Sequence, residues 1–166
     1  MLTLISGTAR PGSRTRQLAD NYLRILREKG AEPRLFCLEE YCVWARDEAF
    51  IQAENELLIP AQKFVFIAPE YNGSIPGMLK MLFDNSDIKK CWWGKKAMLT
   101  GLADGRAGNL RGLDHLTNIL NYLHVNVFWN KIPLSRIGTE MDDSGNLLQP
   151  TTVSVIEDQV EGFLKF

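Results

Sequence analysis

The sequence predicts an α/β fold in which helices cover both faces of a central parallel sheet. Short, nearly continuous apolar runs alternate with amphipathic helical patterns from one end of the chain to the other. Its 166 residues fit one compact domain, with no internal repeat or linker. The hydrophobic fraction of 45% and the charged fraction of 23% are those of an ordinary globular protein.

Five β-α alternations can be assigned along the chain. The expected strands are Leu2–Ser6, Arg34–Leu38, Phe64–Ala68, Lys96–Gly101 and Val125–Trp129. The expected helices are Thr15–Lys29, Phe50–Gln62, Pro76–Asp84, Leu110–Leu123 and Val153–Leu164. Open parallel sheets bind ligands beyond the carboxyl ends of their strands, where the strand order reverses. The residues that follow the first, third and fourth strands are therefore the first candidates for a site.

Charge and cysteine content exclude several classes of protein. The formal net charge is −1, which favours neither nucleic acid nor an anionic membrane as a partner. The three cysteines, Cys37, Cys42 and Cys91, form no CxxC pair, so neither a disulfide framework nor a zinc site is expected. No apolar run is long enough to span a bilayer. We therefore expect a cytoplasmic protein with no membrane partner.

The loop after the first strand, residues 7–15, has the composition of a phosphate site. A helix N-terminus offers unpaired backbone N–H groups and a partial positive charge. Thr8, Ser13 and Thr15 add hydroxyl groups, and Arg10 or Arg14 adds a charge-assisted bond. The glycine spacing matches neither a Walker A loop nor a GxGxxG fingerprint. The alternative is a plain turn that precedes a capped helix.

The loop after the third strand reads Pro69-Glu70-Tyr71-Asn72-Gly73-Ser74. Asn72 and Gly73 can adopt positive φ angles at little cost, which lets the chain turn its backbone amides toward the edge of a flat polar ring. Tyr71 could cover one side of such a ring. An ordinary turn would need only the Asn-Gly pair.

Together the two loops resemble the signatures of the NADPH-dependent FMN reductase family. The second loop and the residues after it resemble PEYN-x-S-x-PG-x-LK, and the first resembles GS-x-R-x-x-S-x-N. The resemblance implies a flavodoxin-like, doubly wound five-stranded parallel sheet with strand order 2-1-3-4-5 and helices on both faces. It also implies FMN bound without a covalent link, NADPH or NADH as hydride donor, and a homodimer or homotetramer.

The same resemblance implies roles for individual residues. Thr8, Arg10, Ser13 and Thr15 would hold the FMN phosphate, with Arg14 as a further candidate. The isoalloxazine would lie along Pro69, Glu70, Tyr71, Asn72 and Gly73. A third loop, Thr100–Ala107, would bound the other edge of the ring through Thr100, Gly101 and Gly105. The sequence departs from the family where Thr15 and Met81 replace asparagines and where the third loop has one glycine instead of a pair.

The expected activity is hydride transfer from the nicotinamide to FMN and on to a small acceptor, such as a quinone, an azo compound or free flavin. A flavin carries this redox chemistry itself, so no catalytic side chain is expected. Three alternatives share the fold: a flavodoxin-type electron carrier, a flavin-binding sensor without turnover, and a phosphate-binding regulator. Near-zero net charge and Arg10 in the first loop favour the reductase, and the missing aspartate pocket argues against the regulator.

Other conspicuous residues have simpler interpretations. His115 and His124 have no Cys or carboxylate at metal spacing, so no metal site is expected. Residues 142–146 lack the alternating aspartates of a calcium loop and are expected to form a loop tip. The adjacent Trp92 and Trp93 would form an apolar patch if exposed, which would favour a subunit interface or a wall over the partner's flavin. A position at the edge of the core is the alternative.

Overall fold

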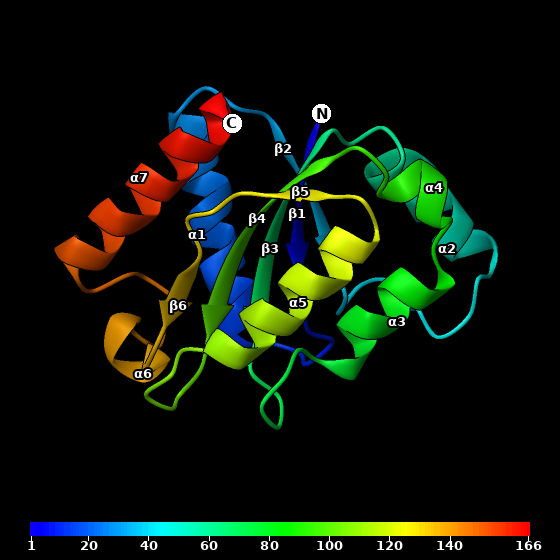
Figure 1. Cartoon of the computed structure of the whole chain (residues 1–166). Helices are drawn as coiled ribbons and strands as arrows, with labels where there is room; N and C mark the ends of the chain where they lie inside the picture. The colour runs from blue at the N-terminus through cyan, green and yellow to red at the C-terminus, as the bar shows by residue number, and fades with distance from the viewer.

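The computed structural model describes all residues 1–166, built around a parallel sheet. Its longer strands are β1 (Leu2–Ser6), β2 (Pro33–Cys37), β3 (Lys63–Pro69) and β4 (Lys96–Leu102). The order is β2-β1-β3-β4-β5, as predicted, and every pairing is parallel. Ser6, the last residue of β1, lies opposite Cys37 and Ile67. The carboxyl ends of the strands therefore meet at one edge of the sheet, at the bottom of Figure 1.

The last position in the sheet is divided between two short strands. β5 (Asn126–Val127) pairs with the start of β4, and β6 (Ile132–Leu134) pairs with its end. The predicted strand Val125–Trp129 is therefore longer than the observed β5, and the sequence pattern did not predict β6. Pro133 accounts for the omission because proline has no N–H to donate to a neighbouring strand, although the edge of a sheet tolerates it.

Helices cover both faces of the sheet (Figure 1). One face carries α1 (Arg14–Glu28) and α7 (Pro150–Lys165). The other face carries α2 (Glu48–Ala53), the π-helical turn η1 (Glu54–Leu58), α3 (Gly77–Asn85), α4 (Ile88–Cys91) and α5 (Leu110–Tyr122). The predicted helix 50–62 is thus two shorter pieces. α6 (Ile137–Glu140) follows β6 beside the carboxyl edge, in a segment that carried no helical signal.

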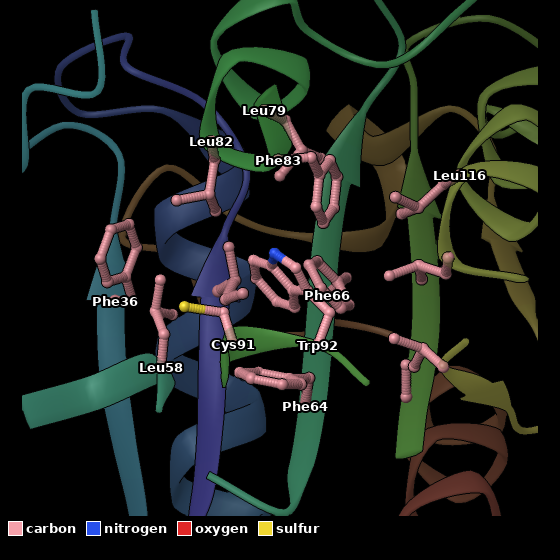
Figure 2. Packing of buried hydrophobic residues seen from close by; sticks show 14 of the residues in the cluster. Phe36, Leu58, Phe64, Phe66, Leu79, Leu82, Phe83, Cys91, Trp92 and Leu116 are labelled. Carbon is pink, nitrogen blue, oxygen red and sulfur yellow. The ribbon is translucent and has the colours of Figure 1, made fainter. Parts of the chain in front are cut away.

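The two tryptophans do not form an exposed patch. Trp92 is completely buried, with its ring centroid 4.9 Å from that of Phe64 and its indole N–H donating to Ser86 Oγ over 2.7 Å (Figure 2). Trp93 is 44% exposed and stacks on His124. The proposed tryptophan patch is therefore wrong, because Trp92 belongs to the core under α4 and only Trp93 reaches the surface.

A buried polar network joins α1, β4 and α7. The Tyr22 hydroxyl lies 2.8 Å from Thr100 Oγ1 and donates to Gln159 Oε1 over 2.9 Å. The Gln159 amide donates in turn to the carbonyls of Leu99 and Asn130. Burial raises the pKa of Tyr22 above its ordinary value, so its hydroxyl remains a neutral donor.

Tyr22→Phe is expected to lower the free energy of unfolding by about 1 kcal/mol. The loss is modest because Gln159 Oε1 keeps its bond from Thr100 Oγ1 at 3.1 Å. Urea denaturation measures it, with Tyr122→Phe as the control because Tyr122 is 82% exposed. Equal stability of the two variants would contradict a role for this network.

Candidate functional site

A cleft of about 280 Å³ opens at the carboxyl edge of the sheet. It brings together residues that follow β1, β3 and β4, together with one residue of α6. The lining residues are Arg10, Pro11, Ser13, Arg14, Thr15, Pro69, Glu70, Tyr71, Leu102, Ala103, Asp104 and Ile137. The three loops that the sequence singled out thus meet in one place.

Glycines shape the first loop. A Cβ on Gly7 would lie 2.9 Å from the carbonyl oxygen of Ile67, so only glycine lets the end of β1 approach β3 this closely. Gly12 has a φ of 61° and turns the chain into α1. Ser13 then caps the helix by accepting from the amide of Arg16 over 3.2 Å. The loop therefore does contain a turn followed by a capped helix, which was the alternative to a phosphate site.

The backbone amides of this loop are largely free. Gly7 donates to Ile67 O and Arg10 donates to Thr8 Oγ1, whereas the amides of Thr8, Ala9, Gly12 and Ser13 donate no hydrogen bond within the chain. Thr8 is buried and Ala9 and Ser13 are partly buried, whereas Gly12 is exposed. Amides without partners are uncommon at buried positions in folded proteins. Free amides beside the N-terminus of a 15-residue helix are the donor set that binds a phosphate.

The two arginines of the loop are held differently. The Arg14 guanidinium donates to the carbonyl of Asp142 and to Asp143 Oδ1, which ties the cleft to the turn 142–146. An antiparallel bridge from Met141 to Leu147 closes this turn, in agreement with the expected loop tip. The Arg10 guanidinium has no carboxylate partner and lies 4.2 Å from the centroid of the Tyr71 ring. Arg10 is therefore the cation that remains available for an anionic ligand.

The second loop is a tight turn that projects from the end of β3. Asn72 and Gly73 have φ angles of 53° and 77°, and Tyr71 and Ser74 exchange two backbone hydrogen bonds across them. Ser74 Oγ contacts His115 Nδ1 of α5 at 2.8 Å, which gives this histidine a local partner. Pro69, Glu70 and Tyr71 line the cleft, whereas Asn72 and Gly73 form the tip of the turn outside that lining.

The third loop is held against β3 and β6. Its Ala103 amide donates to Leu134 O, and the Asn109 side-chain amide donates to Ala68 O over 2.8 Å. Gly108 and Asn109 both have positive φ angles, of 59° and 68°. The amides of Asp104, Gly105, Arg106 and Ala107 donate no hydrogen bond within the chain and remain free for a ligand.

The structure places the three predicted residues of the third loop away from the cleft lining. Thr100 is buried in the Tyr22 network, on the α1 side of the sheet. Gly101 is needed for packing, because its Cβ would lie 2.7 Å from Gly108 O. Gly105 is exposed and its missing side chain would meet open space. The residues of this strand end and loop that do reach the cleft are Leu102, Ala103 and Asp104.

Sequence reasoning also missed Ile137 and Asn109. Ile137 reaches the cleft from α6, a four-residue helix with no recognisable pattern. Asn109 fixes the end of the third loop from a completely buried position. A signal for Asn109 was present, since a Gly-Asn pair favours positive φ angles just as the Asn-Gly pair of the second loop does.

The donor set of the cleft fits the two ends of an FMN molecule. Free amides, hydroxyl groups and Arg10 gather in the first loop, where an anion is stabilised. Pro69, Leu102 and Ile137 add apolar walls to the same cleft, and Asp104 of the third loop contributes a free amide to it. Across the whole chain, no group of three His, Cys, Asp or Glu side chains is placed to hold a metal ion.

Comparison with known proteins gives a family match that includes all three loops. A family model described as NADPH-dependent FMN reductase matches residues 1–136. The protein named "Probable NADPH:quinone oxidoreductase 2" from Oryza sativa subsp. japonica is 31% identical over 115 residues, which cover 66% of this chain and 56% of that protein. An NAD(P)H-dependent FMN reductase from Pseudomonas aeruginosa is 30% identical over 115 residues, covering 67% and 62%. The match thus spans somewhat more than half of these relatives.

Solved structures show the same fold at lower identity. FerB from Paracoccus denitrificans, a flavoenzyme NAD(P)H:(acceptor) oxidoreductase, superimposes with a TM-score of 0.79 at 18% identity, covering 99% of this chain and 94% of its own. Two-electron reduced Megasphaera elsdenii flavodoxin superimposes with a TM-score of 0.64 at 12% identity and full coverage of both chains. The fold is therefore flavodoxin-like.

Proposed function

The chain belongs to the NADPH-dependent FMN reductase family, and from this premise we propose that it is an FMN-dependent NAD(P)H oxidoreductase. Its hydride donor is NADPH or NADH, and its acceptor is a small molecule such as a quinone, an azo compound or free flavin. The observation that carries the proposal is the cleft itself. Three loops meet there, and the first presents free amides, hydroxyl groups and the unpaired Arg10 beside a helix N-terminus.

The residues of the first loop would hold the phosphate of FMN. The free amides of Thr8, Ala9, Gly12 and Ser13, together with the N-terminus of α1, would stabilise its negative charge. Arg10 would add a charge-assisted bond by leaving the Tyr71 ring, which costs only an exposed cation–π contact. Ser13 and Thr15 line the same end of the cleft, whereas the Thr8 hydroxyl is engaged by Tyr71 at 2.6 Å.

Pro69, Glu70 and Tyr71 would border the ring system on one side, and the third loop would border it on the other. When bound, FMN accepts a hydride from the nicotinamide and passes the electrons to the acceptor. Free amides from Asp104 to Ala107 are the donors available to stabilise negative charge that develops on a bound ring. No general acid, general base or nucleophile is required of the chain.

Two features support a reductase over a flavodoxin-type electron carrier. The family match and the curated relatives are reductases, whereas the flavodoxins resemble this chain in fold alone. Arg10 also contributes a cation to the phosphate loop of a chain whose net charge is only −1. The reductase therefore accounts for more of the observations.

Anaerobic addition of NADPH or NADH to the FMN-loaded protein tests the proposal. A reductase is expected to lose its flavin absorbance within seconds of mixing with at least one nicotinamide, and to recover it when a quinone is added. Absorbance that persists with both nicotinamides, but falls with dithionite, would contradict turnover and favour the carrier or the sensor. The nicotinamide that reacts faster identifies the physiological donor.

The proposal also includes a cytoplasmic location and a homodimer or homotetramer, both of which extend the family resemblance to this chain. None of its helices combines the length and the apolar character that crossing a membrane requires.

A further inference from the structure

A second, larger cavity lies on the other side of Tyr71. It has a volume of about 610 Å³, within the range of small-molecule sites. Its apolar lining includes Trp44, from the segment between β2 and α2, and Met78 and Met81, from α3. Trp44 is 67% exposed although its side chain is large and apolar. Methionines and exposed aromatic residues are typical of surfaces that bind flat organic ligands.

The charged residues of this cavity have one sign. Arg10 and Lys80 line it, and no carboxylate does. Lys80 Nζ is 2.6 Å from Asp84 Oδ1 on the next turn of α3, so its charge is partly offset. Arg10 has no carboxylate partner and rests on the Tyr71 ring. An apolar surface edged by two cations complements a ligand that is both aromatic and negatively charged.

The cavity adjoins the cleft without being part of it. Arg10 and Tyr71 line both spaces, and the Tyr71 hydroxyl is fixed at 2.6 Å from Thr8 Oγ1. The Tyr71 ring is therefore a partition between them. A ligand in the cavity contacts one side of this partition while the cleft remains free for another molecule.

We propose that this cavity is a binding site for a planar aromatic anion, a molecule of one or two fused rings with a carboxylate or an ionised ring oxygen. The rings would lie between Trp44 and the two methionines, and the negative group would face Lys80, joined by Arg10 while the cleft holds no FMN. This inference goes beyond the proposed function, because Tyr71 separates the ligand from the cleft that would hold FMN. A second copy of the chain is the competing occupant, but an apolar contact between copies gives no role to the two cations.

Isothermal titration calorimetry with 2-naphthoate and 2-naphthamide tests the site, because the two probes differ mainly in charge. The protein is titrated twice, as purified and after saturation with FMN. We expect 2-naphthoate to bind the purified protein at least about fivefold more tightly than 2-naphthamide, as an exposed ion pair allows. Saturation with FMN, which draws Arg10 to its phosphate, should weaken 2-naphthoate without displacing it. Trp44→Ala is expected to weaken both probes.

Two substitutions on α3 should change the preference in opposite directions. Lys80→Gln is expected to weaken 2-naphthoate about two- to fivefold without affecting 2-naphthamide. Asp84→Asn frees Lys80 from its partner and is expected to strengthen 2-naphthoate by about twofold. Lys90→Gln is the matched control, because it removes one positive charge from α4 outside the cavity.

Several outcomes would overturn the site. Complete, competitive displacement of 2-naphthoate by FMN would place the probe in the cleft, and equal affinity for the two probes in the purified protein would remove the role of charge. An affinity that falls with protein concentration, with sedimentation showing that Trp44→Ala dissociates an oligomer, would assign the cavity to a second copy. Failure to bind FMN would contradict the proposed function alone, since the titration of the purified protein would still report on the cavity.

Discussion

Replacing Thr8 and Ser13 with alanine and Arg10 with glutamate is expected to raise the Kd for FMN by about a hundredfold or more. Bonds to a charged ligand contribute about 1.5–3 kcal/mol each, so the loss of two accounts for that factor. The change removes two hydroxyl groups and turns the one unpaired cation of the loop into an anion that repels phosphate. The affinity for riboflavin, which has no phosphate, should change far less.

Equilibrium dialysis against each flavin measures both constants. Arg24→Glu is the matched control, since it makes the same charge change on the exposed side of α1, away from the cleft. Ser13 also caps α1, and its loss costs about 1 kcal/mol of stability. A double variant at Thr8 and Arg10 keeps the cap and separates this effect from binding. Unchanged FMN affinity in a folded triple variant would refute the phosphate assignment.

Gly108→Ala is expected to lower the free energy of unfolding by about 3 kcal/mol. Gly108 has a φ of 59°, and a Cβ there would lie 2.5 Å from the carbonyl carbon of Pro133. The neighbour is backbone of β6, which cannot rotate away as a side chain could. The third loop would have to move from β6, and with it Ala103 and Asp104 at the cleft.

Gly105→Ala is the matched control within the same loop. Its Cβ would meet nothing within 4 Å, so its stability should stay within about 0.5 kcal/mol of the parent chain. Urea denaturation of the three proteins gives the comparison. A Gly108→Ala variant as stable as Gly105→Ala would show that the close approach to Pro133 does not constrain the loop.

The parallel sheet was predictable because apolar runs and helical patterns alternate without interruption, whereas its strand order came only from the family resemblance. The division of the sheet edge beside β4 into two short strands, β5 and β6, was not predictable from the local sequence pattern. β6 has only three residues with a proline in the middle, and it is a strand because the end of β4 offers it a partner. Tertiary packing likewise places Trp92 in the core, since its ring lies between those of Phe64 and Phe83 (Figure 2).

The first loop and most of the second could be located from sequence because their glycine, hydroxyl and arginine residues are close together in the chain. The third loop was also located, but the residues through which it reaches the cleft were not predicted, because they depend on where β6 and α6 hold the loop. The family resemblance placed Thr100 at the edge of the ring, but the alternation of a strand turns that side chain toward α1 and Tyr22. Asn109 acts through a carbonyl of β3 that is 41 residues earlier in the chain.

Titration of the flavin-free protein with FMN and with riboflavin tests the central claim most directly. A cleft whose first loop grips a phosphate predicts saturable binding of FMN and at least about tenfold weaker binding of riboflavin, the equivalent of one charge-assisted bond. Equal affinity for the two flavins, or no uptake of FMN at saturating concentration, would contradict it.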